Sequence, residues 1–118
     1  MYKYYNANSH NNFIDDCVIR SIAVAEGRSW DDVYEELSIL ARKEGLLFSN
    51  VSFVENYLDN KYKRINFKSK TVNQFLNTHQ NGIYLITMKG HITCLYYGVI
   101  IDTFDCRYRI MKSAWKVL

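Results

Sequence analysis

The chain has 118 residues, which is enough for one domain with one hydrophobic core and too few for two. Hydrophobic residues make up 48% of the chain and aromatic residues 15%, which excludes a disordered protein. The formal net charge is only +3, and the basic residues cluster only at positions 61–64 and 68–70. Because nucleic-acid-binding proteins usually show a basic face, this pattern argues against a nucleic-acid partner.

The start of the chain lacks the basic-then-apolar pattern of a signal peptide, and no apolar run is long enough to span a bilayer. The three cysteines cannot all pair, and none of them belongs to a Cys-x-x-Cys unit. We therefore expect a cytoplasmic protein with reduced thiols and no membrane partner.

The first half of the chain predicts a polar segment followed by three helices. Residues 1–14 are rich in tyrosine and asparagine and are predicted to form a lead-in segment without a helix. Asp15 or Asp16 can cap the first helix, and Gly27 is its expected C-terminal stop. Apolar residues at helical spacing then predict the helices, which cover residues 16–26, 30–44 and 50–58.

The second half predicts one more helix and a β-rich end. Thr71 and Gln74 form a capping box for a helix that ends near residue 80. Tyr97-Gly98 is suited to a two-residue hairpin turn. Helices first and an antiparallel meander afterwards make the fold class α+β, with N-terminal helices packed on a C-terminal antiparallel sheet. The predicted strands are 62–67, 83–88, 91–97, 99–104 and 107–117.

Cys17 stands at the first turn of the first predicted helix. A free thiol is mostly protonated at neutral pH, and it is activated by the positive end of a helix dipole or by a nearby imidazolium. Asp16 opposes the thiolate locally, unless its carboxylate is used as a helix cap. The alternative is that Cys17 is a small buried residue of an amphipathic helix.

His91 opens the predicted hairpin far downstream of Cys17. With a two-residue turn at 97–98, His91 and Asp102 fall on the same face of the hairpin as diagonal cross-strand neighbours. Asp105 lies on the opposite face, and a one-residue slip in register would exchange the two carboxylates. Alternatively, His91 is a structural hydrogen-bonding residue of the strand.

A thiol at a helix N-terminus, followed by a strand histidine and then a carboxylate, is the chain order of a cysteine nucleophile with its base and orienter. Such chemistry also needs preorganised donors for an oxyanion. The Cys17 backbone N–H is one candidate, and the amide side chains of Asn11 and Asn12 lie a few residues upstream.

At these residues the chain resembles the papain-like cysteine peptidases, and most closely the C39-like peptidase branch. The matching pieces are Asn11, the Asp-Cys pair at 16–17, Gly-His at 90–91 and Gly-Val-Ile-x-Asp-Thr at 98–103. The same pattern is similar to short uncharacterised proteins of this fold that are common in bacteriophage genomes. The resemblance runs from about residue 11 to the end, although each motif by itself is short.

The resemblance implies one papain-like domain over residues 1–118. It also implies that Cys17 is the nucleophile, His91 the general base and Asp102 the orienter. Asn11 would donate to the oxyanion, with Asn where the family usually carries Gln. The implied function is a cysteine-dependent peptidase, isopeptidase or related acyl-transfer hydrolase. It would need no cofactor, would act on a peptide or protein, and would be phage-encoded and cytoplasmic in the bacterial host.

Two other functions are compatible with the sequence. The first is a catalytically inactive binding protein on the same scaffold that antagonises a host protein, because the chain is small and rich in tyrosine. Its second sheet face is also apolar, so either helices cover that face or it is a contact surface that could join two copies as a homodimer. That face comprises Ile92, Cys94, Tyr96, Val99, Ile101 and Thr103.

The second alternative is a zinc site formed by Cys17, His91 and Asp102, with Cys106 or water as the fourth ligand. The spacing of these residues matches no short zinc motif, so we expect no metal. Cys94 is expected to pack in the core, and Cys106 is expected to lie in a turn.

Overall fold

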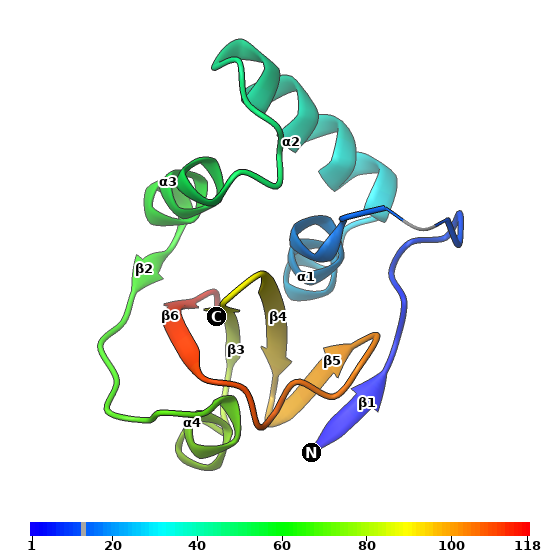
Figure 1. Cartoon of the computed structure of the whole chain (residues 1–118). Coiled ribbons are helices and arrows are strands. Elements are labelled where there is room, and N and C mark those ends of the chain that lie inside the picture. The colour runs from blue at the N-terminus through cyan, green and yellow to red at the C-terminus, as the bar shows by residue number, and fades with distance from the viewer. Residues whose placement is uncertain (13) are drawn as a thin grey trace.

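The computed structural model describes residues 1–12 and 14–118. In this part of the chain, four helices pack on a six-stranded mixed sheet, which confirms the α+β class (Figure 1). None of the helices within the described residues is long and apolar enough to cross a membrane. The sheet order is β1 (Tyr2–Tyr4), β5 (Val99–Asp102), β4 (His91–Tyr96), β3 (Ile83–Met88), β6 (Met111–Lys116) and β2 (Lys63–Arg64).

The helices begin close to where the capping signals predict. The side chains of Ser29 and Asn50 each accept a hydrogen bond from a first-turn backbone N–H, and Thr71 with Gln74 forms the expected capping box. At the end of the first helix, Gly27 adopts the left-handed conformation (φ 64°) that stops a helix. The four helices are α1 (Cys17–Glu26), α2 (Trp30–Lys43), α3 (Val51–Lys61) and α4 (Val72–Thr78).

Strand β3 is apolar on both faces because the sheet is covered on both sides. Ile83 and Leu85 pack with α1, α2 and α3 in one core, and Tyr84 and Ile86 pack with α4 in another. Figure 1 shows α1 between the sheet and α2, with α4 alone on the opposite side. A nearly continuous apolar run is expected for a central strand that is buried on both faces.

The β4–β5 hairpin has the register that the sequence predicts. Tyr96 pairs with Val99, and Cys94 pairs with Ile101. The two turn residues, 97 and 98, both have positive φ (46° and 83°), as in a type I′ turn. This register brings His91 and Asp102 to the same face of the hairpin.

Two features of the sheet differ from the prediction. The lead-in segment contains β1, which pairs in parallel with β5, so the sheet is mixed. Strand β6 pairs with β3 and not with β5, so the chain crosses back over the hairpin and the strands do not form a simple meander. Since β1 occupies the free edge of β5, the only edge open to β6 is that of β3.

Several predicted strands are also shorter than expected. The strand predicted at 62–67 is reduced to two residues, and those predicted at 99–104 and 107–117 are trimmed to Val99–Asp102 and Met111–Lys116. The intervening segment instead packs beside α4, because the backbone N–H groups of Val72 and Asn73 donate to carbonyls of Arg109 and Arg107.

The second apolar face of the hairpin is covered by helix α1. Ile92 and Cys94 are buried in the same core as α1. Of the two alternatives for this face, coverage by helices is therefore the one that the structure shows. The predicted homodimer would therefore have to use the exposed margin of the face, where Tyr96 is 39% exposed.

The packing of α1 between α2 and the sheet predicts a large effect of truncation in its buried stripe. Ile22 is fully buried, and Ile22→Ala should lower the free energy of unfolding by about 2–5 kcal/mol. Ile39→Ala is the matched control on α2, where the side chain is 37% exposed. Its loss of unfolding free energy should be well below that of Ile22→Ala. Urea unfolding measures both, and equal losses would contradict this packing.

Candidate active site

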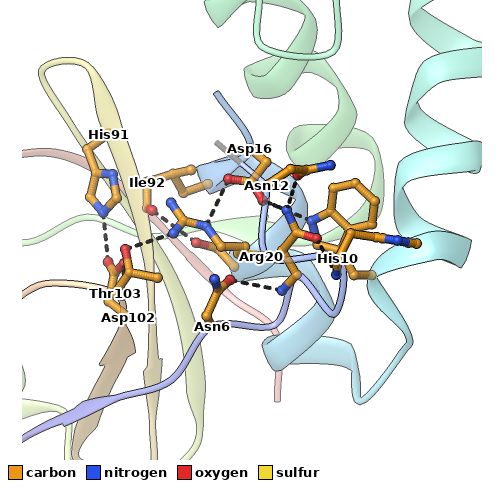
Figure 2. Close-up of polar contacts among 12 residues, drawn as sticks. Asn6, His10, Asn12, Asp16, Arg20, His91, Ile92, Asp102 and Thr103 are labelled. Atoms are coloured by element: carbon orange, nitrogen blue, oxygen red, sulfur yellow. Dashed lines mark hydrogen bonds and ion pairs between the residues drawn. The ribbon is translucent and has the colours of Figure 1, made fainter. Parts of the chain in front are cut away.

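His91 and Asp102 form a buried ion pair at the end of the hairpin. The His91 Nε2 and Asp102 Oδ2 atoms are 2.7 Å apart, and the two side chains are only 6% and 5% exposed. Phe104 packs against the imidazole ring with the two ring centroids 4.6 Å apart, and it screens the pair from water. The structure thus places Asp102 beside His91 (Figure 2). Asp105 is exposed and pairs with Arg107.

The contacts of Asp102 determine which nitrogen of His91 is free. The Thr103 backbone N–H donates to Asp102 Oδ1 over 2.7 Å, so Oδ2 is left to His91 Nε2. The Cys106 thiol also faces Oδ2 at 3.7 Å. Because Nε2 is engaged, Nδ1 is the ring nitrogen that remains for exchanging a proton with a substrate or nucleophile.

Burial is the largest single effect and lowers the pKa of His91, but the hydrogen bonds to Asp102, Cys106 and Cys17 and the charge of Asp102 together outweigh it. Together they raise the pKa of His91 to about 11. Burial likewise raises the pKa of Asp102, but the hydrogen bond and charge of His91 hold it below its usual value. Both shifts favour the pair in its charged form.

These shifts link the pair to folding stability with a definite sign. The pKa of His91 is raised on folding, so its stabilisation is fully present below about pH 6.5 and is lost as the pH rises through about 11. The pKa of Asp102 is lowered, so its stabilisation is fully present above about pH 3.9 and is lost in acid. The pair therefore stabilises the fold most between those two unfolded-state values.

Cys17 and His91 line the same cleft, which has a volume of about 140 Å³. The thiol is half-buried at the first residue of α1 and is close enough to the ring to favour its protonated form. The walls of the cleft are mostly aliphatic, from α1, α3 and the β3–β4 turn, with carboxylates and one ammonium group among them. The residues concerned are Val18, Val51, Val54, Met88, Ile92, Asp15, Glu55 and Lys112.

Asp16 stands at the N-cap of α1, but its carboxylate does not cap the helix. Its oxygens instead face the Arg20 Nε at 3.2 Å and accept hydrogen bonds from Trp30 Nε1 at 3.0 Å and Asn8 Nδ2 at 3.2 Å (Figure 2). The negative charge expected to oppose a Cys17 thiolate is thus paired with a guanidinium.

Asn11 lies outside the Cys17 cleft. It lines a separate hollow of about 450 Å³ that also contains Arg20 and Thr103. A turn with positive φ at Asn11 (53°), closed by its backbone N–H to the Asn8 carbonyl, directs the chain there. The structure does not bring Asn11 together with Cys17 and His91, and its oxyanion role stays a prediction.

The other two cysteines differ from Cys17 in burial. Cys94 is fully buried in the core as expected, and burial followed by the charge of Asp102 raises the pKa of its thiol. Cys106 is predicted as a turn residue, yet it is fully buried beside the His91–Asp102 pair. Cys106 lies in the irregular connection between β5 and β6, where no periodicity of the sequence predicts which residues are in contact.

The zinc alternative is only partly matched by the geometry. Among the described residues, donor atoms of His91, Asp102 and Cys106 lie within 4.8 Å of one another, and Cys17 is not in that group. A structural zinc site usually has four ligands, so this group is one ligand short. In addition, His91 Nε2 is already bonded to Asp102.

A hollow larger than the Cys17 cleft lies elsewhere on the described surface. It has a volume of about 590 Å³ and is lined by residues of β1, the following segment and the two ends of the α1–α2 junction, including Lys3, Tyr5, Arg28 and Tyr96. Neither Cys17 nor His91 reaches it. Size alone does not identify it as a site of chemistry, since it contains no paired nucleophile and base.

Comparisons of the chain with protein-family models, with curated proteins and with solved structures gave no match. The resemblance to papain-like peptidases therefore stays a prediction drawn from the sequence motifs. What the structure adds is the placement of Cys17, His91 and Asp102 around one cleft.

The Asp102 carboxylate should control the protonation of His91. In Asp102→Asn, the burial that lowers the pKa of His91 remains while its main opposing interaction is gone, so the ring should titrate several pH units lower than in the wild type. NMR titration of the ring protons measures both midpoints. The same midpoint in both proteins would contradict the buried ion pair.

Proposed function

We propose that the protein is a cysteine-dependent hydrolase that acts on a peptide or isopeptide amide. The observation that carries this proposal is the His91–Asp102 hydrogen bond at Nε2, which leaves Nδ1 for a thiol in the same cleft. A nucleophile, a base and a third group that orients the base form the arrangement that thiol acyl-transfer enzymes require.

In this proposal, the Cys17 thiol passes its proton to His91 Nδ1, and the sulfur attacks the carbonyl carbon of the substrate to form a tetrahedral intermediate. Protonated His91 then gives its Nδ1 proton to the leaving amine, the C–N bond breaks, and a thioester remains on Cys17. Water attacks the thioester while His91 takes its proton, the C–S bond breaks, and the acid is released. The charge of Asp102 stabilises the imidazolium throughout these steps, and no cofactor is needed.

The oxyanion would be held by the backbone N–H of Cys17, which points out of the first turn of α1. The first N–H groups of a helix have no partner within the helix, so in this proposal the donor turns to the substrate. A second donor is expected near the cleft, and the Asn11 amide would have to move from its own hollow to supply it.

The environment of Asp16 supports an activated thiol. Its carboxylate is the nearest negative charge in sequence to Cys17, and a free carboxylate there would disfavour a thiolate. The ion pair with Arg20 and the bond to Trp30 hold that charge in a buried network. The carboxylate directly before Cys17 is therefore paired, and the imidazolium of His91 favours the thiolate from the other side.

A second candidate function is a catalytically inactive binding protein. It is favoured by the exposed tyrosines near the β1–β5 edge of the sheet, where Tyr4, Tyr5 and Tyr97 are each at least half exposed, and by the 590 Å³ hollow that Tyr5 lines. Tyrosine is a frequent anchor in protein interfaces. In this case the partner would be a protein and the cleft at Cys17 would have no role.

Alkylation by iodoacetamide tests the activation of Cys17. At pH 7, His91→Gln should slow alkylation of Cys17 by on the order of a hundredfold, because the thiol loses the imidazolium that favours its thiolate while its exposure stays the same. His79→Gln is the matched control on the surface of the α4 end and should leave the rate unchanged. Mass spectrometry of each cysteine gives the rates. Equal rates in wild type and His91→Gln would falsify the proposed dyad.

Cleavage of a diverse peptide library separates the two candidate functions. The wild-type protein should generate new amino termini that are absent after incubation with Cys17→Ala, because only the thiol can form the acyl-enzyme. Cys94→Ala is the control for loss of a cysteine away from the cleft. If no peptide is cleaved and Cys17→Ala still binds the same host protein as the wild type, the binding function is correct.

A further inference from the structure

Two neighbouring residues of α1 tie this helix to the strands that carry the base and the orienter. The Arg20 Nη1 donates to Thr103 Oγ1 over 2.8 Å, and the Ser21 hydroxyl donates to the Ile92 carbonyl over 2.9 Å (Figure 2). Thr103 directly follows Asp102 in sequence, and Ile92 directly follows His91. Each tie therefore ends one residue away from a member of the proposed triad.

Thr103, which accepts the Arg20 hydrogen bond, also orients the Asp102 carboxylate. The backbone N–H of Thr103 fixes Asp102 Oδ1 at 2.7 Å, which aims Oδ2 at His91. A shift of Thr103 would carry that N–H with it and rotate the carboxylate away from the ring. The Arg20 contact holds Thr103 from the side of α1, and β1 holds the Asp102 carbonyl through the Tyr5 backbone N–H at 2.9 Å.

The Arg20 side chain is held in place by Asp16, the residue before Cys17. Its Nε faces Asp16 Oδ1 at 3.2 Å, and the Asp16 carbonyl accepts the Arg20 backbone N–H at 2.9 Å. Asp16 is buried and is held in turn by Trp30 of α2 and by Asn8. Since Asp16 precedes Cys17, one guanidinium bridges the residue before the thiol and the residue after the orienting carboxylate.

These contacts do more than packing requires. Arg20 lies on the less buried face of α1, together with Cys17 and Val24, yet its side chain is only 17% exposed and its guanidinium reaches Thr103 and Asp16. A long charged side chain at such a position could extend into water, so packing alone does not require these contacts. The Arg20 charge is thus explained by what it joins.

We propose that Arg20 and Ser21 are positioning residues that hold the Cys17 end of α1 in register with His91 and Asp102. This inference rests on the proposed thiol hydrolase. Neither residue contacts the reacting atoms; each acts through a triad neighbour. Loss of either tie leaves all three triad side chains present but misaligned, and a misplacement of about 1 Å can cost on the order of a hundredfold in rate.

Thr103 provides the sharpest test because it can be altered without changing charge or shape. Thr103→Val removes the oxygen that accepts from Arg20, whereas Thr103→Ser keeps it. Thr103→Val should slow iodoacetamide alkylation of Cys17 by about tenfold or more and lower the NMR titration midpoint of His91, and Thr103→Ser should restore both. Thr78→Val on α4 is the matched substitution away from the site and should change neither quantity.

The outcomes separate this inference from the function on which it rests. If wild-type Cys17 reacts fast but Thr103→Val matches it in rate and in His91 midpoint, the positioning role is wrong and the hydrolase proposal stands. If wild-type Cys17 reacts no faster than in His91→Gln, both are wrong. Thermal unfolding checks that each variant is folded. Should Thr103→Val fail to fold, Ser21→Ala is measured in the same way, and wild-type values there overturn the proposal.

Discussion

The hydrogen bond between His91 and Asp102 depends on the register of one hairpin. Because successive side chains of a strand point to opposite faces, a slip of one residue would bury one member of the pair in the α1 core and leave the other on the α4 side. The register is fixed by the tight turn at 97–98 and by the burial of both faces. A strand with two apolar faces tolerates no slip, since both cores must be filled at once.

The β4–β5 hairpin supplies only His91 and Asp102 of the proposed triad. The Cys17 thiol lies on α1, near the N-terminus of the chain. Helix α1 packs on the face of β4 that includes Ile92 and Cys94, while the His91 ring belongs to the opposite face. Thiol and ring can therefore meet only at the end of the sheet, where α1 begins and β4 begins. This explains why the cleft is small and why its walls come from both helices and strands.

The parts of this structure that sequence reasoning predicted are those set by local rules. Helix caps, the two-residue turn and the two-residue periodicity of the hairpin depend on neighbours in the chain, and together they predicted α1 to α4 and the pairing of His91 with Asp102. Strand β1 was missed because three residues in a polar segment become a strand only when β5 offers an edge. The contact of Cys106 was missed for a similar reason, since it depends on the path of an irregular connection.

Arg20 belongs to the part of the site that the sequence did not reveal. It lies on the less buried face of α1 with Cys17 and Val24, where a charged residue agrees with the helical pattern and gives no sign of a specific partner. The partner itself could not be read from the chain, because Thr103 lies 83 residues away and on a different element. Three groups are in contact across the site: the Asp16 carboxylate, the Arg20 guanidinium and the Thr103 hydroxyl. Arg20 makes both of the contacts concerned: its Nε pairs with Asp16, and its Nη1 donates to Thr103. The same side chain therefore neutralises the charge beside the thiol and holds the residue that follows the orienting carboxylate.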